Sequence, residues 1–345
     1  MNWYLAPAKA IDLSMIDQAK NYQKTLTKPP GSLGQLEDIA ALFSAWQNTI
    51  KPDVNKVDIV IMAGDHGVAA ENVSAFPQVV TAEMVRNFAR GGAAISVLAK
   101  HLQARLTVVN LGTINPLEPL DGVIDKRIAS GTENICLAEA MTAEQLEQAL
   151  AVGKEVAQRA HADGAKLFIG GEMGIANTTP AACVIARLLA KYPVQVVGPG
   201  SGLGAAEVVH KTQVVERALA KHTVTDPVDV LRALGGFEIA GLTGAFIACA
   251  QLGLPILLDG YIVTAAALAA VAINPRVKDW LFASHCSAEP AHEMMLESLG
   301  KEALIDLHMQ LSEGSGATIA MPLIQAACRL QSEMASFEET DITTG

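Results

Sequence analysis

The sequence predicts an α/β protein built on an open parallel sheet with helices on both faces. Half of the 345 residues are hydrophobic, but only 4% are aromatic, and there are 28 glycines. This balance favours helices packed closely on a sheet over a β-sandwich, whose strands are rich in aromatic and β-branched residues. A unit of buried strand, small polar loop and helix also recurs about five or six times along the chain, as a parallel sheet requires.

Charge and cysteine content exclude several classes of protein. The net charge of -11 leaves no basic surface for a nucleic acid, so any bound phosphate should be small and locally held. The five cysteines are scattered, and the chain opens without a basic and then apolar leader, which predicts a reduced, cytoplasmic protein. Polar residues and Pro255 interrupt the most apolar region, residues 239–273, into pieces too short to span a membrane.

The first 50 residues contain no predicted strand. Apolar residues recur at helical spacing over residues 12–27 and 36–49, and the stiff connector Lys28-Pro29-Pro30-Gly31-Ser32-Leu33-Gly34 separates the two runs. This part of the chain is therefore expected to form a small helical lobe.

The sheet is expected to begin at residues 57–63, a buried apolar run that ends in Asp65-His66-Gly67. Helices are predicted over residues 81–90 and 93–102, and the next strand over residues 106–110. His66 could be a ligand, an acid or a structural histidine, and its position alone does not decide between these.

The middle of the chain repeats the pattern with glycine-rich strand exits. A helix over residues 143–162 and a strand over residues 166–169 precede the turn from Gly170 to Ala181, in which Thr179 is expected to cap the next helix and Pro180 to begin it. A helix to Lys191, a strand over residues 194–197 and the exit from Gly198 to Gly204 follow. Such turns present backbone N–H groups that can bind an anion.

In the last third, a strand over residues 256–258 ends in Asp259-Gly260, and a helix is expected over residues 262–271. A further strand at residues 280–283 leads into Ser284-His285-Cys286-Ser287-Ala288-Glu289. Residues 311–317 then place Glu313 among small residues before a helix over residues 318–330, where free N–H groups are expected. A capped helix start with a solvated Glu313 is the alternative. Polar residues at successive strand exits indicate a Rossmann-like three-layer fold with its site at that edge.

Several activities lack their sequence signatures. No His-Glu-x-x-His or paired metal-ligand spacing occurs, no P-loop is present, and Gly200-Ser201-Gly202 lacks the spacing of a nucleophile elbow. Cys286 follows His285, but adjacent side chains usually point apart. Gly202-Leu203-Gly204 is an incomplete dinucleotide fingerprint, so a dehydrogenase and a non-catalytic nucleotide-binding protein stay as alternatives.

The remaining features are several anion cradles, few cations and isolated acidic residues. Lys211 is the best placed cation, and Glu172 and Glu313 are each flanked by glycine. This combination suits a reaction on a sugar phosphate in which one proton is removed.

Seven motifs in order give a specific resemblance over residues 20–330. They are Lys28 to Gly34, Asp65 to Val68, Gly171 to Ala182, Gly235 to Glu238, Leu257 to Gly260, Ser284 to Glu289 and Glu313 to Ala317. Together they resemble the nicotinate-nucleotide:dimethylbenzimidazole phosphoribosyltransferases.

The resemblance implies a cytoplasmic homodimer with no metal or cofactor. It implies a small helical domain formed by residues 1–50 with about 300–345, and a large parallel α/β domain of residues 51–300. The implied reaction moves the phosphoribosyl group of nicotinate mononucleotide to a benzimidazole, which gives α-ribazole 5'-phosphate and nicotinate for the lower ligand of cobalamin.

The resemblance also assigns the candidate site residues. Glu313 would be the general base, and Glu172 would orient the azole or stabilise positive charge. Phe76 and Met84 would line the pocket of the aromatic base, with core packing as the alternative for Met84. Asp65 and Asp259 are expected to brace strand ends. The candidates for binding the phosphate and sugar are Gly174, Asn177, Thr178, Thr179, Gly202, Lys211, Ser287, Gly314, Ser315 and Gly316.

Overall fold

A computed structural model describes residues 2–200 and 202–340, and the predicted sheet is present. Six parallel strands lie in the order β3-β2-β1-β4-β5-β6. Their bounds are β1 Val57–Gly64, β2 Arg105–Gly112, β3 Val123–Asp125, β4 Leu167–Met173, β5 Ile256–Leu258 and β6 Leu281–Ala283. β1 is buried along its whole length because layers of helices cover both of its faces.

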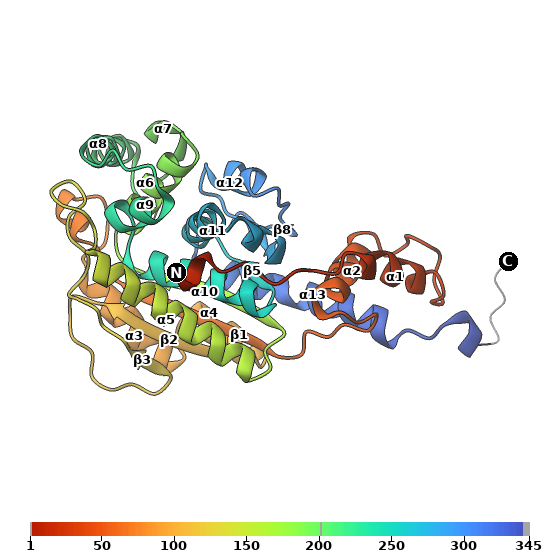
Figure 1. Ribbon diagram of the computed structural model, residues 1–345. Helices are drawn as coiled ribbons and strands as arrows, with labels where there is room; N and C mark the ends of the chain where they lie inside the picture. The colour runs from red at the N-terminus through yellow and green to blue at the C-terminus, as the bar shows by residue number, and fades with distance from the viewer. Residues whose placement is uncertain (1, 201, 341–345) are drawn as a thin grey trace.

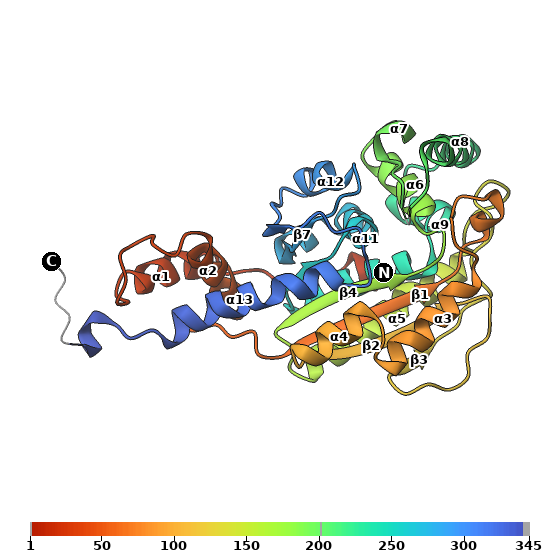
Figure 2. The same cartoon turned by 180° about the vertical axis from the view of Figure 1, so that it is seen from behind.

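The helices form two layers on the sheet and a cap at one edge (Figures 1 and 2). α5 and α10 cover one face, and α3, α4 and α13 the other. The cap contains α6, α7, α8, α9, α11 and α12. The bounds are α3 Val79–Arg90, α4 Ala94–His101, α5 Ala143–Ala162, α6 Thr178–Leu188, α7 Pro193–Val196, α8 Ala205–Lys221, α9 Pro227–Leu234, α10 Phe237–Leu252, α11 Tyr261–Ile273, α12 His292–Ser298 and α13 Ser315–Glu333. The described part of the chain contains no helix long and apolar enough to span a membrane.

Two helices near the start of the chain and the far end of α13 lie side by side away from the sheet, whereas residues 3–9 lie against α10 (Figure 1). α1 Ser14–Gln23 packs on α2 Gln35–Gln47, and α2 packs on α13. The Gln331 amide donates to the Ser44 hydroxyl at 2.8 Å and accepts a hydrogen bond from Gln23 at 2.6 Å. The division into two domains stays a prediction, and residues 341–345 of the predicted small domain lie outside the described residues.

Three predictions about the glycine-rich exits are wrong. β4 extends through Gly170 and Gly171 to Met173, because glycine in a strand lets neighbouring backbone approach closely. α6 begins at Thr178 and ends at Leu188, three residues before Lys191, and Asn177 instead of Thr179 occupies its N-cap position.

The third error is the strand predicted over residues 194–197. These residues form the short helix α7, which starts with Pro193 and is closed by a hydrogen bond from Tyr192 N to the Gln195 side chain at 3.0 Å. The Val194 side chain is 74% exposed. A short run of valines cannot distinguish a strand from a helix, and here no neighbouring strand pairs with it.

α5 and α10 pack closely because glycines lie at their contact. A Cβ added at Gly153 would lie 2.6 Å from Ala245 N and closer still to the Gly241 carbonyl oxygen. Gly153→Ala should therefore lower the free energy of unfolding by about 1–3 kcal/mol, measured by urea denaturation. At an unconstrained helix position the same change would raise stability by about 1 kcal/mol, so the sign is informative. The exposed neighbour Ala151→Ser should change stability by less than about 0.5 kcal/mol, and a stabilised Gly153→Ala would contradict the packing argument.

Candidate active site

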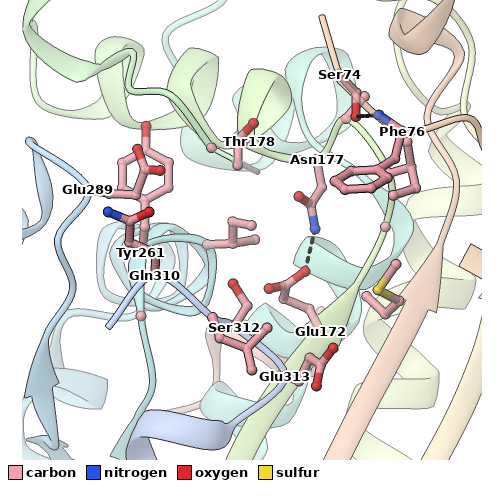
Figure 3. Close-up of a pocket in the computed structure, with 18 of the residues that line it drawn as sticks. Ser74, Phe76, Glu172, Asn177, Thr178, Tyr261, Glu289, Gln310, Ser312 and Glu313 are labelled. Atoms are coloured by element: carbon pink, nitrogen blue, oxygen red, sulfur yellow. Dashed lines mark hydrogen bonds between the residues drawn. The ribbon is translucent and has the colours of Figure 1, made fainter. Parts of the chain in front are cut away.

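A cavity of about 420 Å³ opens at the carboxyl edge of the sheet, beyond the end of β4. Its walls come from the loop before α3, the β4–α6 connection, the start of α11 and the segment before α13. Figure 3 shows Glu172, Ser312 and Glu313 along one side, Thr178 opposite them, Phe76 on one flank, and Glu289 and Tyr261 on the other. This location is the one expected for a ligand site in an open parallel sheet.

The cavity brings together most of the predicted site residues. Those that line it are Phe76, Met84, Glu172, Gly174, Asn177, Thr178, Ser287 and Glu313. The predicted residues that lie outside its lining are Thr179, Gly202, Lys211, Gly314, Ser315 and Gly316. Ser201, next to Gly202, lies outside the described residues.

Glu172 is a buried carboxyl group at the end of β4. Its side chain accepts a hydrogen bond from the Asn177 amide, and the other carboxyl oxygen has no partner among the described residues. Burial raises the pKa of Glu172 to about 8, and the carboxylates of Glu238 and Asp259 add to the rise, while Ser312 and Asn177 oppose it. The Glu172 side chain is therefore mostly protonated at neutral pH when the cavity holds no cation.

Glu313 is the second carboxyl group of the cavity, and it precedes α13. It is 6% exposed and adopts a left-handed backbone conformation with φ 73°. Burial raises the pKa of Glu313 to about 7, and the negative charge of Asp259 contributes to the rise. Two buried carboxyl groups with raised pKa values therefore share one cavity, as is common at sites of acid–base chemistry.

The prediction of free N–H groups at the start of α13 is wrong. α13 begins at Ser315, three residues earlier than expected, and the Asp259 carboxylate accepts hydrogen bonds from Gly314 N and Ala317 N, each at 2.9 Å. The predicted role of Asp259 as a brace at a strand end agrees with these contacts. An anion therefore already occupies this helix terminus, and it is a carboxylate of the protein itself.

The start of α6 lies across the cavity, but the predicted row of free N–H groups is wrong. Asn177 N donates to the Gly174 carbonyl at 3.2 Å and Thr179 N to the Ala176 carbonyl at 3.1 Å, which leaves the Thr178 N–H for a ligand. Thr178 is its first residue, so its backbone N–H has no acceptor within the helix. Behind Thr178, the buried Lys211 ammonium donates to the Thr178 hydroxyl at 2.7 Å and to the Gly198 carbonyl at 3.1 Å. Burial lowers the pKa of Lys211 to about 8, and Glu289 opposes this shift. Lys211 thus supplies positive charge to this end of the cavity from behind its wall.

His66 supports the floor of the same region. The Nε2 atom of His66 shares a hydrogen bond with the Oε1 atom of Glu238 at 2.8 Å, and both side chains are fully buried. A Cβ added at Gly174 would lie 3.1 Å from His66 Nε2. His66 is therefore a structural residue below the β4–α6 connection, and its partner is Glu238 from α10 instead of its own loop.

One wall of the cavity is apolar and can receive a flat ring. Phe76 is 50% exposed, and Met84, Val73 and Val80 lie beside it. An aromatic side chain that keeps half its surface open beside a cavity can still bury that surface against a ligand. The core alternative for Met84 does not exclude ligand contact, because Met84 packs on the core and also lines the cavity.

Several cavity residues were missed as individual candidates. Glu289 and Ser312 lie within or beside quoted motifs, whereas Tyr261 and Gln310 carried no signal of their own. Burial raises the pKa of Glu289, and the Lys211 charge opposes the rise. The Tyr261 hydroxyl donates to the Val196 carbonyl at 2.7 Å and so ties α11 to α7. Among the described residues, no group of three or more acidic, His or Cys side chains could hold a metal ion.

Comparison with known proteins gives consistent full-length matches. A family model described as "Phosphoribosyltransferase" matches residues 8–342. Proteins named nicotinate-nucleotide–dimethylbenzimidazole phosphoribosyltransferase from Pseudomonas fluorescens and Azotobacter vinelandii are each 51% identical, over 99% of this chain and 98% of theirs. The crystal structure of CobT from Thermus thermophilus superposes with a TM-score of 0.92 at 43% identity, covering 96% of this chain and 100% of that one. The chain therefore belongs to the nicotinate-nucleotide–dimethylbenzimidazole phosphoribosyltransferase family and is a phosphoribosyltransferase.

Proposed function

We propose that this enzyme transfers the phosphoribosyl group of nicotinate mononucleotide to 5,6-dimethylbenzimidazole or a related azole, in assembly of the cobalamin nucleotide loop. The products are α-ribazole 5'-phosphate and nicotinate. The names of relatives that are 51% identical over nearly their whole length support the reaction. The observation that carries the proposal is a cavity that combines an apolar wall, Thr178 at the start of α6 with Lys211 behind it, and Glu313 with a pKa of about 7.

The chemistry of the substrates fits a single base. The leaving nitrogen of nicotinate mononucleotide belongs to a pyridinium ring, so it departs as a neutral heterocycle and needs no strong acid. The azole nitrogen attacks the anomeric carbon from the opposite face, which inverts β to α through an oxocarbenium-like transition state. The other azole nitrogen then loses its proton, and we assign this proton to the Glu313 carboxylate.

The remaining residues follow from this orientation. The phosphate meets the backbone N–H and hydroxyl of Thr178, backed by Lys211, while the azole ring packs against Phe76 and Met84. Glu172 stabilises positive charge near the reacting centre, because the pyridinium cation of the bound nucleotide favours its ionised form. Gly174, Asn177 and Ser287 complete the sugar and phosphate contacts.

The direct test is turnover of nicotinate mononucleotide with dimethylbenzimidazole by the purified protein, followed by chromatography of α-ribazole 5'-phosphate. Formation of the α-anomer supports the proposal. No product with any azole, together with tight nucleotide binding, would favour a binding protein, and tight NAD binding would favour the dehydrogenase.

The pH dependence of kcat/KM should show an acid limb near pH 7. Glu313 accepts a proton only as the carboxylate, so activity should fall about tenfold for each unit of pH below its pKa of about 7. Steady-state rates from pH 5 to 9 at fixed ionic strength measure this limb. A rate that stays constant down to pH 5 would contradict a base with a raised pKa, since an ordinary glutamate loses its proton near pH 4.3.

We also propose that the protein is a cytoplasmic homodimer, on the basis of the family resemblance. Light scattering should give twice the mass of the chain, and a monomer mass would remove this part of the proposal.

A further inference from the structure

Asp259 caps a helix that belongs to a distant part of the chain. It follows β5 directly, is 1% exposed, and binds Gly314 N through Oδ2 and Ala317 N through Oδ1. Helix N-caps usually come from the residue just before the helix. Here the N-cap residue is Gly314, which has no side chain. The carboxylate of Asp259, 55 residues upstream, accepts the N–H hydrogen bond instead. Any displacement of Asp259 therefore moves the start of α13 and the residue before it.

The residue before it is Glu313, whose backbone is held in an uncommon conformation. Glu313 and Gly314 have φ 73° and 81°, and a non-glycine residue in the left-handed region costs about 1–3 kcal/mol unless its surroundings support it. Support comes from two strands. Asp259 binds the next N–H along the chain, and Gly171 of β4 lies against the Glu313 backbone so closely that an added Cβ would be 2.6 Å from the Glu313 carbonyl carbon.

Titratable side chains from several elements lie in this region. Asp259 follows β5, Glu172 ends β4, Glu238 belongs to α10, and His285 belongs to β7 His285–Cys286, with Nδ1 3.9 Å from the Asp259 carboxylate. Burial raises the pKa of Asp259, and His285 and the two backbone N–H groups oppose that rise. Asp259 is the charged side chain that raises the proton affinity of Glu313, in addition to burial.

We propose that Asp259 is a positioning residue for the phosphoribosyl transfer, which fixes Glu313 at the cavity through its hydrogen bonds to the N-terminus of α13. The inference rests on the proposed function of Glu313. Asp259 touches no reacting atom. Its hydrogen bonds orient Glu313, and its negative charge raises the pKa of Glu313.

The test compares Asp259→Asn with wild type. The amide has nearly the same shape and keeps one acceptor oxygen, but it removes the charge and one hydrogen bond. We expect kcat to fall at least about tenfold, because a base misplaced by a fraction of an ångström loses much of its effect. We expect the affinity for nicotinate mononucleotide to change less than about threefold. The acid limb of kcat/KM should move to lower pH, since loss of a nearby negative charge lowers the pKa of Glu313.

Asp65→Asn is the matched control for lost stability. Asp65 is also 1% exposed at the end of a central strand, and it accepts hydrogen bonds from Thr81 at 2.6 Å and from Ile114 N at 2.8 Å, away from the Glu313 loop. Its replacement should lower the melting temperature comparably but leave the acid limb at the pH of wild type. Asp259→Ser, which removes the charge and places its only side-chain oxygen one bond closer to the backbone, provides a second variant with the same expected shift.

The outcomes separate this inference from the proposed function. If both Asp259 variants keep the wild-type acid limb and lose kcat only in step with the control, Asp259 is a structural brace and the inference is overturned. If instead Glu313→Gln retains full activity and the same acid limb, the assignment of Glu313 itself fails.

Discussion

Glu313→Gln should lower kcat for α-ribazole 5'-phosphate formation by about 10²- to 10⁴-fold, the usual contribution of a positioned general base. Glutamine preserves the size of the side chain and its hydrogen-bonding atoms, but it cannot accept the azole proton. Binding of nicotinate mononucleotide should be nearly unchanged, because Thr178, where we propose that the phosphate binds, lies across the cavity from Glu313 (Figure 3). Single-turnover rates and isothermal titration of the nucleotide measure the two effects separately.

Glu293→Gln is the matched control for this variant. Glu293 is exposed on α12 and lies outside the cavity lining, so the same chemical change there should leave kcat within about twofold. The acid limb of the pH profile should also disappear in Glu313→Gln. A variant with full activity would transfer the role of base to Glu172, which lines the same cavity.

Lys211→Met should weaken the binding of nicotinate mononucleotide by about 10- to 100-fold, which corresponds to the 1.5–3 kcal/mol of a charged hydrogen bond. The ammonium is 1% exposed and bonds to both the Thr178 hydroxyl and the Gly198 carbonyl. Methionine fills the same space without charge. The loss should appear mainly in KM for the nucleotide, because the role that we propose for Lys211 is at the phosphate and not at the azole proton.

The exposed Lys221 on the same helix α8 supplies the control. Lys221→Met removes the same charge from the protein but no contact with Thr178, so the nucleotide affinity should stay within about twofold. Equal losses in both variants would mean that only the overall charge matters. An unchanged KM in Lys211→Met would place the phosphate elsewhere in the cavity.

Local sequence patterns predicted helices and strands correctly where the packing of the fold favours the same secondary structure as the segment's own residues. The helix predicted over residues 143–162 has the same bounds in α5, and the strand predicted over residues 57–63 is β1 with one more residue. The prediction was wrong for residues 194–197, where β-branched side chains occur but no neighbouring strand pairs with them. The predicted strand also ended too early, before Gly170 and Gly171. Glycine is required there by segments that are distant in the sequence and pack against β4.

The sequence by itself determined the α/β class, the position of the site at the strand exits, and the family, since each depends on residues that are close together or on motifs in order. Tertiary structure alone decided which exits share one cavity. It brought Tyr261, Glu289 and Thr178 to one cavity, buried Lys211 behind Thr178, and placed the Asp259 carboxylate at the start of α13. The physical reason is that hydrogen bonding and desolvation act between atoms brought together only by folding, and no local pattern encodes those pairs.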